Sequence, residues 1–94
     1  MRAAASADIA NIHHYSIEQF GPAIAEDYLT GLDLAISGLA DFPELGQLQH
    51  GLTQPFRALT YRSHRIYYVF DGNTIFVIRI LHHAMNAATR LVND

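Results

Sequence analysis

The sequence lacks cysteine altogether. A disulfide framework, a catalytic thiolate and a cysteine-ligated zinc or iron–sulfur site are therefore excluded. Long apolar runs are missing too: no segment approaches the roughly 18 uninterrupted apolar residues of a membrane helix, and Met1–Ser6 leads into Asp8 rather than into the core of a signal peptide. These absences predict a soluble cytoplasmic protein that uses no cofactor and no membrane partner.

Lysine is also absent, so all six basic residues are arginines, and nine acidic residues outnumber them to give a formal net charge of −3. Affinity for a phosphate backbone comes largely from neutralising its charge and releasing counterions. The balance therefore argues against strong direct nucleic-acid binding. Positive and negative charges are unevenly distributed along the chain: residues 7–46 hold seven acids and no arginine, whereas four arginines lie within residues 57–79.

What is present suffices for one folded core. Half of the 94 residues are hydrophobic and 16% are charged, which is too apolar for a disordered chain. The length is short of two domains. We therefore expect residues 1–94 to form a single domain.

The first half has the period of helices. Ile9 and Ile12 begin a pattern of three- and four-residue spacings, which Gly21 and Pro22 interrupt. Glycine suits a helix C-terminal cap, and proline suits the first turn of the next helix because the N–H it lacks would be unpaired there. A second helix is predicted from Pro22 to Ala40. Its apolar stripe consists of Ala25, Tyr28, Leu32, Ala35, Leu39 and Phe42.

The second half has the period of strands. Three segments are rich in β-branched and aromatic residues, and Asp71-Gly72 is a strong two-residue hairpin signal. The predicted strands are Phe56–Tyr61, His64–Phe70 and Thr74–Leu81. With Asp71 and Gly72 as the loop, Tyr68 pairs with Ile75 and His64 with Arg79.

That register assigns residues to the two faces of the sheet. One face would carry His64, Ile66, Tyr68, Ile75, Val77 and Arg79, and the other Arg65, Tyr67, Val69, Phe76, Ile78 and Ile80. Neither face is polar throughout, so we expect one to pack on the helices and the other to be partly covered by a partner. The tail from Ala84 to Val92 is compatible with a short closing helix. The fold class is therefore α+β, with a helical hairpin packed on an antiparallel sheet.

Several stretches of the chain, taken together, resemble one family. They are Ala7-Asp8-Ile9 with Ile12 and Tyr15-Ser16, Phe20-Gly21, residues 39–46 (LADFPELG), Ser63-His64-Arg65-Ile66-Tyr67-Tyr68, and Ile78-Arg79-Ile80-Leu81-His82, followed by Met85 and Arg90-Leu91. In this order they are similar to the ParE branch of the RelE/ParE superfamily, the toxins of bacterial type II toxin–antitoxin modules. The resemblance spans nearly the whole chain. It implies a strand, a helical hairpin, a three-stranded meander and a short final helix, of which the first strand is apparently missing here.

The resemblance also implies a function. ParE-type toxins poison DNA gyrase by binding and form hetero-oligomers with a cognate ParD-like antitoxin, which neutralises them by wrapping an extended segment over the toxin. The RelE branch instead cuts mRNA on the ribosome, so a ribosome-dependent endonuclease is the alternative. A degenerate, non-toxic binding module is a third reading, because the first strand is missing and basic residues are few.

Candidate site residues follow from these readings. If the chain is RelE-like, Arg65 stands where the relatives carry a phosphate-binding arginine, and His82 and His83 could supply a general acid or base. The plainer reading makes Arg65 a structural arginine and the histidines a strand end or a partner contact. The absence of lysine, and of a tyrosine in the final segment, favours binding without catalysis.

The remaining candidates are contacts for a protein partner. Tyr67 and Tyr68 are adjacent, so one should lie in the core and the other should be available to a partner. Arg79, between two isoleucines, is expected to be a paired scaffold residue. His13-His14 with His50 completes no metal pattern, and we expect no metal. The partner-binding candidates are Arg57, Arg62, Arg65, Tyr67, His82, His83, Met85 and Arg90.

Overall fold

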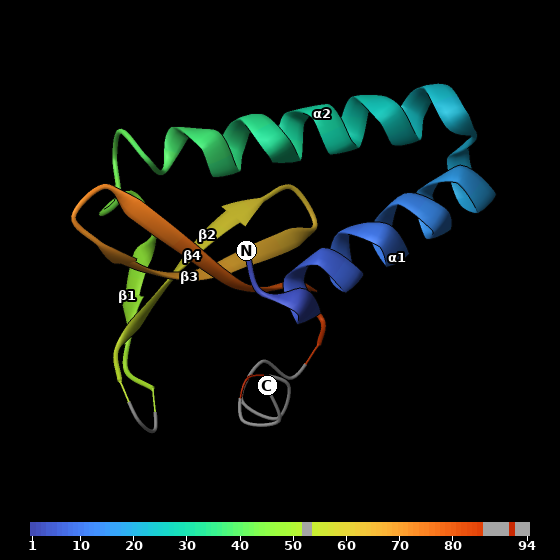
Figure 1. The fold of residues 1–94 in the computed structure, drawn as a ribbon. Helices are drawn as coiled ribbons and strands as arrows, with labels where there is room; N and C mark the ends of the chain where they lie inside the picture. Colours follow the sequence, from blue (N-terminus) through green and yellow to red (C-terminus); the bar gives the residue numbers. More distant parts are fainter. Residues whose placement is uncertain (52–53, 86–90, 92–94) are drawn as a thin grey trace.

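The structure is a computed structural model that describes residues 1–51, 54–85 and 91. Within them the chain forms two helices followed by four strands, which confirms the α+β prediction. The elements are α1 (Ala3–Phe20), α2 (Pro22–Gly38), β1 (Gln47–Gln49), β2 (Phe56–Tyr61), β3 (His64–Asp71) and β4 (Thr74–His82). The strands form one antiparallel sheet in the order β1-β2-β3-β4, and the helices meet at a sharp corner beside it (Figure 1).

The corner between the helices lies at the predicted residues. Gly21 has φ 87° and ψ 166°, a conformation that residues with a Cβ rarely adopt, and its N–H donates to the Ile17 carbonyl at 3.0 Å. Pro22 begins α2 directly afterwards. The chain therefore reverses within one residue, so the two helices pack as an antiparallel pair. No helix in the part of the chain that the structure describes is both long and apolar enough to cross a membrane.

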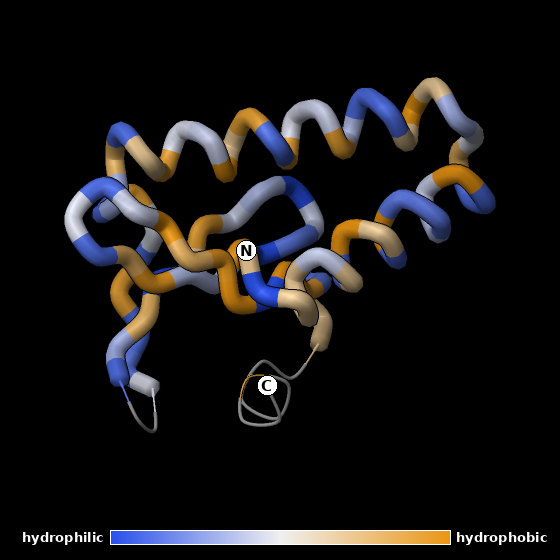
Figure 2. Tube along the Cα trace, viewed as in Figure 1, coloured by the Kyte–Doolittle hydropathy of each residue, from blue (hydrophilic) through white to orange (hydrophobic). Residues whose placement is uncertain are grey.

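The core lies between the helices and one face of the sheet. Both helices alternate between hydrophobic and hydrophilic residues, as an element with one buried side must (Figure 2). The predicted stripe of α2 is confirmed from Ala25 to Leu39, but Phe42 is 68% exposed because the helix ends at Gly38. The buried cluster consists of Ala5, Ile12, Leu32, Leu39, Ile66, Tyr68, Val77 and Ile80.

The predicted hairpin register is wrong by one residue at the turn. Asp71 pairs with Thr74, so the loop residues are Gly72 and Asn73. Gly72 has φ 61° and Asn73 has no positive φ, which is the pattern of a type II′ turn, with glycine in the first central position. The predicted loop would have needed a positive φ at Asp71 as well. The correct register pairs Phe70 with Ile75.

A β-bulge changes the register again further along the hairpin. Tyr68 pairs with Val77 but Tyr67 pairs with Arg79, so Ile78 is the extra residue in β4. The predicted face assignment is therefore wrong for Arg79, which pairs with Tyr67, and for Ile80, which joins Val77 in the core cluster. All three predicted strands lie within one residue of their observed bounds, whereas β1 was not predicted.

The outer edge of β4 is held by residues from the start of the chain. Arg2 is extended, and its N–H donates to the Val77 carbonyl at 3.1 Å. Asp8, one turn into α1, accepts the Ile80 N–H at 2.9 Å through Oδ2. The same carboxylate accepts two hydrogen bonds from the Arg79 guanidinium, one from Nε at 2.8 Å and one from Nη2 at 2.9 Å. Arg79 is thus the paired scaffold residue that the sequence predicted.

Replacing Asp8 with alanine should strongly destabilise the fold. The two side chains are only 11% and 17% exposed, and the substitution removes the acceptor of both the Arg79 guanidinium and the Ile80 N–H. Breaking a mostly buried pair of this kind costs about 3 kcal/mol. Urea unfolding followed by circular dichroism measures the loss. Asp33→Ala, at an exposed position of α2, is the matched control and should change the free energy of unfolding by less than about 0.5 kcal/mol; equal losses would contradict the role given to Asp8.

Candidate partner-binding surfaces

Five aromatic side chains meet where β3 begins and β4 ends, next to α2. The ring centroids of Tyr61 and Tyr28 are 5.1 Å apart, those of Tyr28 and His64 are 5.6 Å apart, and those of His64 and His82 are 5.4 Å apart, all edge to face. His83 completes the row, with its ring centroid 4.3 Å from that of His82. This row, called the ring ladder below, runs from the β2–β3 turn to the exposed His83.

Hydrogen bonds fix the inner part of the ring ladder. The Tyr28 hydroxyl lies 2.7 Å from His64 Nδ1, and the Tyr61 hydroxyl donates to the Tyr28 carbonyl at 2.8 Å. A Cβ at Gly31 would collide with the Tyr61 hydroxyl, so the glycine lets α2 approach β2 this closely. Burial lowers the pKa of His64, and the neighbouring His82 and His83 lower it further, while Asp8 opposes them. Burial likewise raises the pKa of Tyr28.

Two of the RelE-type candidates, Arg65 and His82, lie on opposite faces of the sheet. His82 pairs with His64, whereas Arg65 pairs with Leu81, and successive residues of a strand point to opposite faces. Arg65 is therefore exposed on the sheet face away from the helices, on the other side of the sheet from the His82 ring. His83 is exposed, and its N–H donates to the Ser63 carbonyl at 2.9 Å.

The remaining arginines have different surroundings. Arg57 Nη1 donates to the Gly46 carbonyl at 2.8 Å and to the Glu44 carbonyl at 3.2 Å, so it fastens the loop before β1. Its guanidinium lies 5.9 Å from the centre of the Phe70 ring. Arg62 is exposed at the β2–β3 turn. Arg90 lies outside the described residues.

The two adjacent tyrosines lie on opposite faces of the sheet as expected, but both are buried. Tyr68 is fully buried, donates to the Pro43 carbonyl at 2.7 Å and accepts the Gly46 N–H at 2.8 Å. Tyr67 is on the opposite face beside Phe56 and is 5% exposed, so in this chain its ring is not open to a partner. Met85 is 45% exposed. Most of the expected closing helix, Ala84 to Val92, lies outside the described residues.

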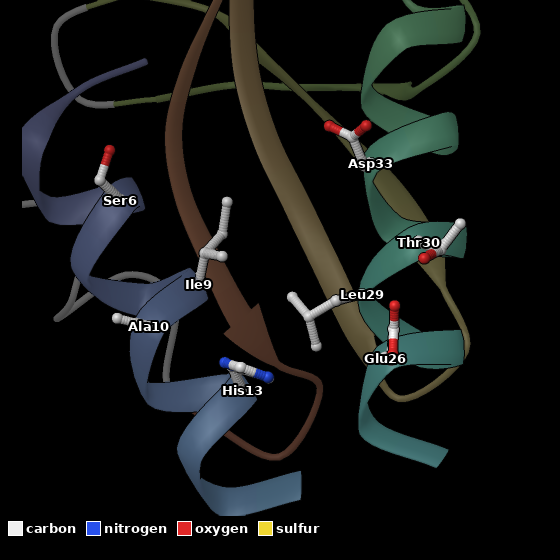
Figure 3. Close-up of a pocket in the computed structure, with 8 residues that line it drawn as sticks. All are labelled: Ser6, Ile9, Ala10, His13, Glu26, Leu29, Thr30 and Asp33. Carbon is white, nitrogen blue, oxygen red and sulfur yellow. The ribbon is translucent and has the colours of Figure 1, made fainter. Parts of the chain in front are cut away.

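An open groove of about 470 Å³ runs between the two helices (Figure 3). Its lining is Ser6, Ile9, Ala10 and His13 from α1 with Glu26, Leu29, Thr30 and Asp33 from α2. Ile9 and Leu29 are half-buried and form an apolar floor, while the carboxylates of Glu26 and Asp33 lie on the α2 wall. The groove thus combines an apolar floor with an acidic wall on α2.

Comparison with known proteins identifies the family. Residues 1–87 match the family model described as the ParE toxin of the type II toxin–antitoxin system parDE. This chain belongs to the ParE toxin family. It is similar to Toxin ParE1 of Caulobacter vibrioides, with 34% identity over 87 residues that cover 93% of this chain and 90% of the relative. It is also similar to Toxin ParE1 of Mycobacterium tuberculosis (strain H37Rv), with 33% identity over 89 residues that cover 94% and 91%.

Family membership gives the general role of the chain. The chain is the toxin component of a type II toxin–antitoxin module, so an antitoxin is among its partners. No cluster of three or more histidine, aspartate or glutamate side chains within residues 1–51, 54–85 and 91 could hold a metal ion. His14 instead pairs with Glu18 at 2.7 Å along the exposed side of α1. The groove, the exposed end of the ring ladder and the β2–β3 turn are among the ParE surfaces that a partner can reach.

Two features of the ParE site were missed by the sequence prediction. His64 was not a candidate, although it is the centre of the ring ladder. The correct register would have revealed it, because that register pairs His64 with His82. The residues that line the groove were not candidates either, although Glu26 and Asp33 belong to the acidic first half of the chain and are spaced seven residues apart on α2.

The stability of the ParE fold should fall as pH drops below about 6.5. Because the pKa of His64 in the folded chain lies below the ordinary value of 6.5, the unfolded chain binds the proton first. The contribution of His64 is thus fully present above that value and declines as the pH falls toward the lowered pKa. Urea unfolding at several pH values from 5 to 8 measures it. His64→Gln, which keeps an acceptor for Tyr28, should show a shallower decline, and an unchanged slope would contradict this account.

Proposed function

We propose that this toxin inhibits DNA gyrase by stoichiometric binding, without covalent chemistry, and that it acts in the cytoplasm. Resemblance to the ParE branch supports gyrase as the target. The observation that favours binding over RNA cleavage is the separation of Arg65 from His82 by the thickness of the sheet. Cleavage needs a phosphate-binding group and a general acid or base within reach of the same phosphate. Arg65 and His82 do not form such a pair, because they lie on opposite faces of the sheet.

We also propose that a ParD-like antitoxin neutralises the toxin by occupying the groove between α1 and α2. The apolar floor at Ile9 and Leu29 suits apolar anchors on one side of an amphipathic helix. The carboxylates of Glu26 and Asp33 suit lysine or arginine at the edge of that helix. An antitoxin segment that is apolar on one side and basic at its border therefore fits the groove.

Purified toxin should reduce supercoiling by DNA gyrase and increase cleaved DNA complexes. The same preparation should leave ribosome-bound mRNA intact, because binding to gyrase requires no reaction at a phosphate. Gel assays of plasmid topology and of message integrity measure the two outcomes, and added antitoxin should restore supercoiling. Transcript fragments that disappear with Arg65→Ala would instead establish the RelE-type activity.

Filling the groove should weaken antitoxin binding without unfolding the toxin. Ala10→Arg places a long cation on the exposed α1 wall, where it blocks the floor and repels a basic helix border. We expect at least a tenfold loss of affinity, about 1.4 kcal/mol, by isothermal titration calorimetry. Asn11→Arg introduces the same side chain at an exposed position of α1 outside the groove lining and is the matched control. Equal affinities for the two variants would rule out the groove as the antitoxin site.

A further inference from the structure

The β2–β3 turn holds an arginine in a conformation that favours glycine. Arg62 has φ 48°, and no other non-glycine residue in the described part of the chain has a positive φ. A side chain with a Cβ is strained in the left-handed region, and such strain persists where the surrounding structure enforces it, often at functional sites. A glycine or asparagine would form this turn with less strain, so the identity of the residue calls for a role of its guanidinium.

The guanidinium of Arg62 rests on two aromatic rings. It lies 5.6 Å from the centre of the Tyr28 ring and 5.5 Å from the centre of the Tyr61 ring. These rings are themselves fixed, because they pack edge to face and the Tyr61 hydroxyl donates to the Tyr28 carbonyl. Cation–π contact with rigid rings holds the planar fork in place before any ligand arrives. Binding then costs less side-chain entropy than it would for a freely rotating arginine.

A carboxylate already lies close to this fork. Asp27 Oδ2 is 3.9 Å from Arg62 Nη1, and the two side chains are 77% and 58% exposed, so their pairing is loose and screened by water. By contrast, Arg79 is bound in both arms by Asp8, and Arg57 donates to two carbonyls. Arg62 therefore combines a fixed position with a weakly held acceptor that another carboxylate could replace.

We propose that the β2–β3 turn binds an acidic segment of a protein partner, with Arg62 gripping a glutamate or aspartate carboxylate above Tyr28 and Tyr61. Charge complementarity favours a short acidic peptide over nucleic acid. Glu26, Asp27 and Asp33 line the exposed side of the adjacent α2, and these carboxylates would repel an extended phosphate backbone but leave room for one carboxylate. Asp27 marks the position of the incoming group and competes with it.

Because Asp27 competes with the incoming carboxylate, two substitutions should change the affinity for an acidic peptide in opposite directions. Removing the internal competitor with Asp27→Asn should tighten binding of an acidic peptide about threefold, the effect expected of an exposed pair. Removing the anchor with Arg62→Gly should abolish binding while the melting temperature stays the same or rises, because glycine accepts the positive φ. If Arg62 and Asp27 formed only a structural ion pair, both substitutions would lower the stability of the fold. Neither would then change the affinity for the peptide.

The test uses NMR titration of the full chain with a capped Gly-Gly-Glu-Gly-Gly peptide, and does not depend on gyrase or the antitoxin. Saturable shifts of the Arg62 side-chain and Ser63 amide signals are expected, with affinity ordered Asp27→Asn, then the unchanged chain, then Arg62→Gly. Arg65→Gln, at an exposed arginine on the far face of the sheet, is the control and should bind like the unchanged chain.

Three results would overturn the proposal. The first is equal binding of the peptide in which glutamine replaces glutamate, which would remove the need for a carboxylate. The second is weaker binding by Asp27→Asn. The third is binding of an oligothymidylate at Arg62 in preference to the acidic peptide, which would make the turn a nucleic-acid contact.

Discussion

The bond between Asp8 and Arg79 connects the two layers of the molecule. Its partners are 71 residues apart in sequence, and the Asp8 carboxylate accepts from the Ile80 backbone as well as from both arms of the guanidinium. One acidic residue therefore sets where α1 crosses the edge of β4 and how deeply it lies. The position of α1 in turn sets one wall of the groove, while Tyr28, through the ring ladder, sets the other. The groove is thus a product of two long-range polar contacts and not only of apolar packing.

Neighbouring residues of helix α2 contact different parts of the molecule. Tyr28 turns inward to His64 and Tyr61, and Leu29 lines the groove. Asp27, one residue earlier, reaches the β2–β3 turn. A helix held rigidly on its inner side presents its outer side in a fixed geometry, which lowers the entropy lost when a partner binds. This arrangement suits a toxin that has an antitoxin among its partners.

The sequence predicted the parts of the fold that have local signals. Gly21-Pro22 located the corner, the three- and four-residue spacing located both helices, and alternation located three strands. The strand β1 was not predicted because three residues, Gln47–Gln49, are too few to show a period. The register failed because Asp71-Gly72 and Gly72-Asn73 are both acceptable turns, and no local pattern reveals the bulge at Ile78. Together these two shifts move the partner of His64 from Arg79 to His82, so the ring ladder could not be foreseen. The same change of register places Arg65 and His82 on opposite faces of the sheet.

The two outer edges of the sheet differ in what they offer to another chain. On β4, the extended backbone of Arg2 occupies the Val77 carbonyl and Asp8 occupies the Ile80 N–H. On β1, no described strand lies beyond Gln47–Gln49, and its residues carry no charge that would repel a newcomer. A sheet that can be extended on one side only can join a second sheet across a two-fold axis, but it cannot add subunits without end. The Asp8 carboxylate thus occupies a backbone donor on the β4 edge, which another strand would need for pairing, in addition to fixing the position of α1.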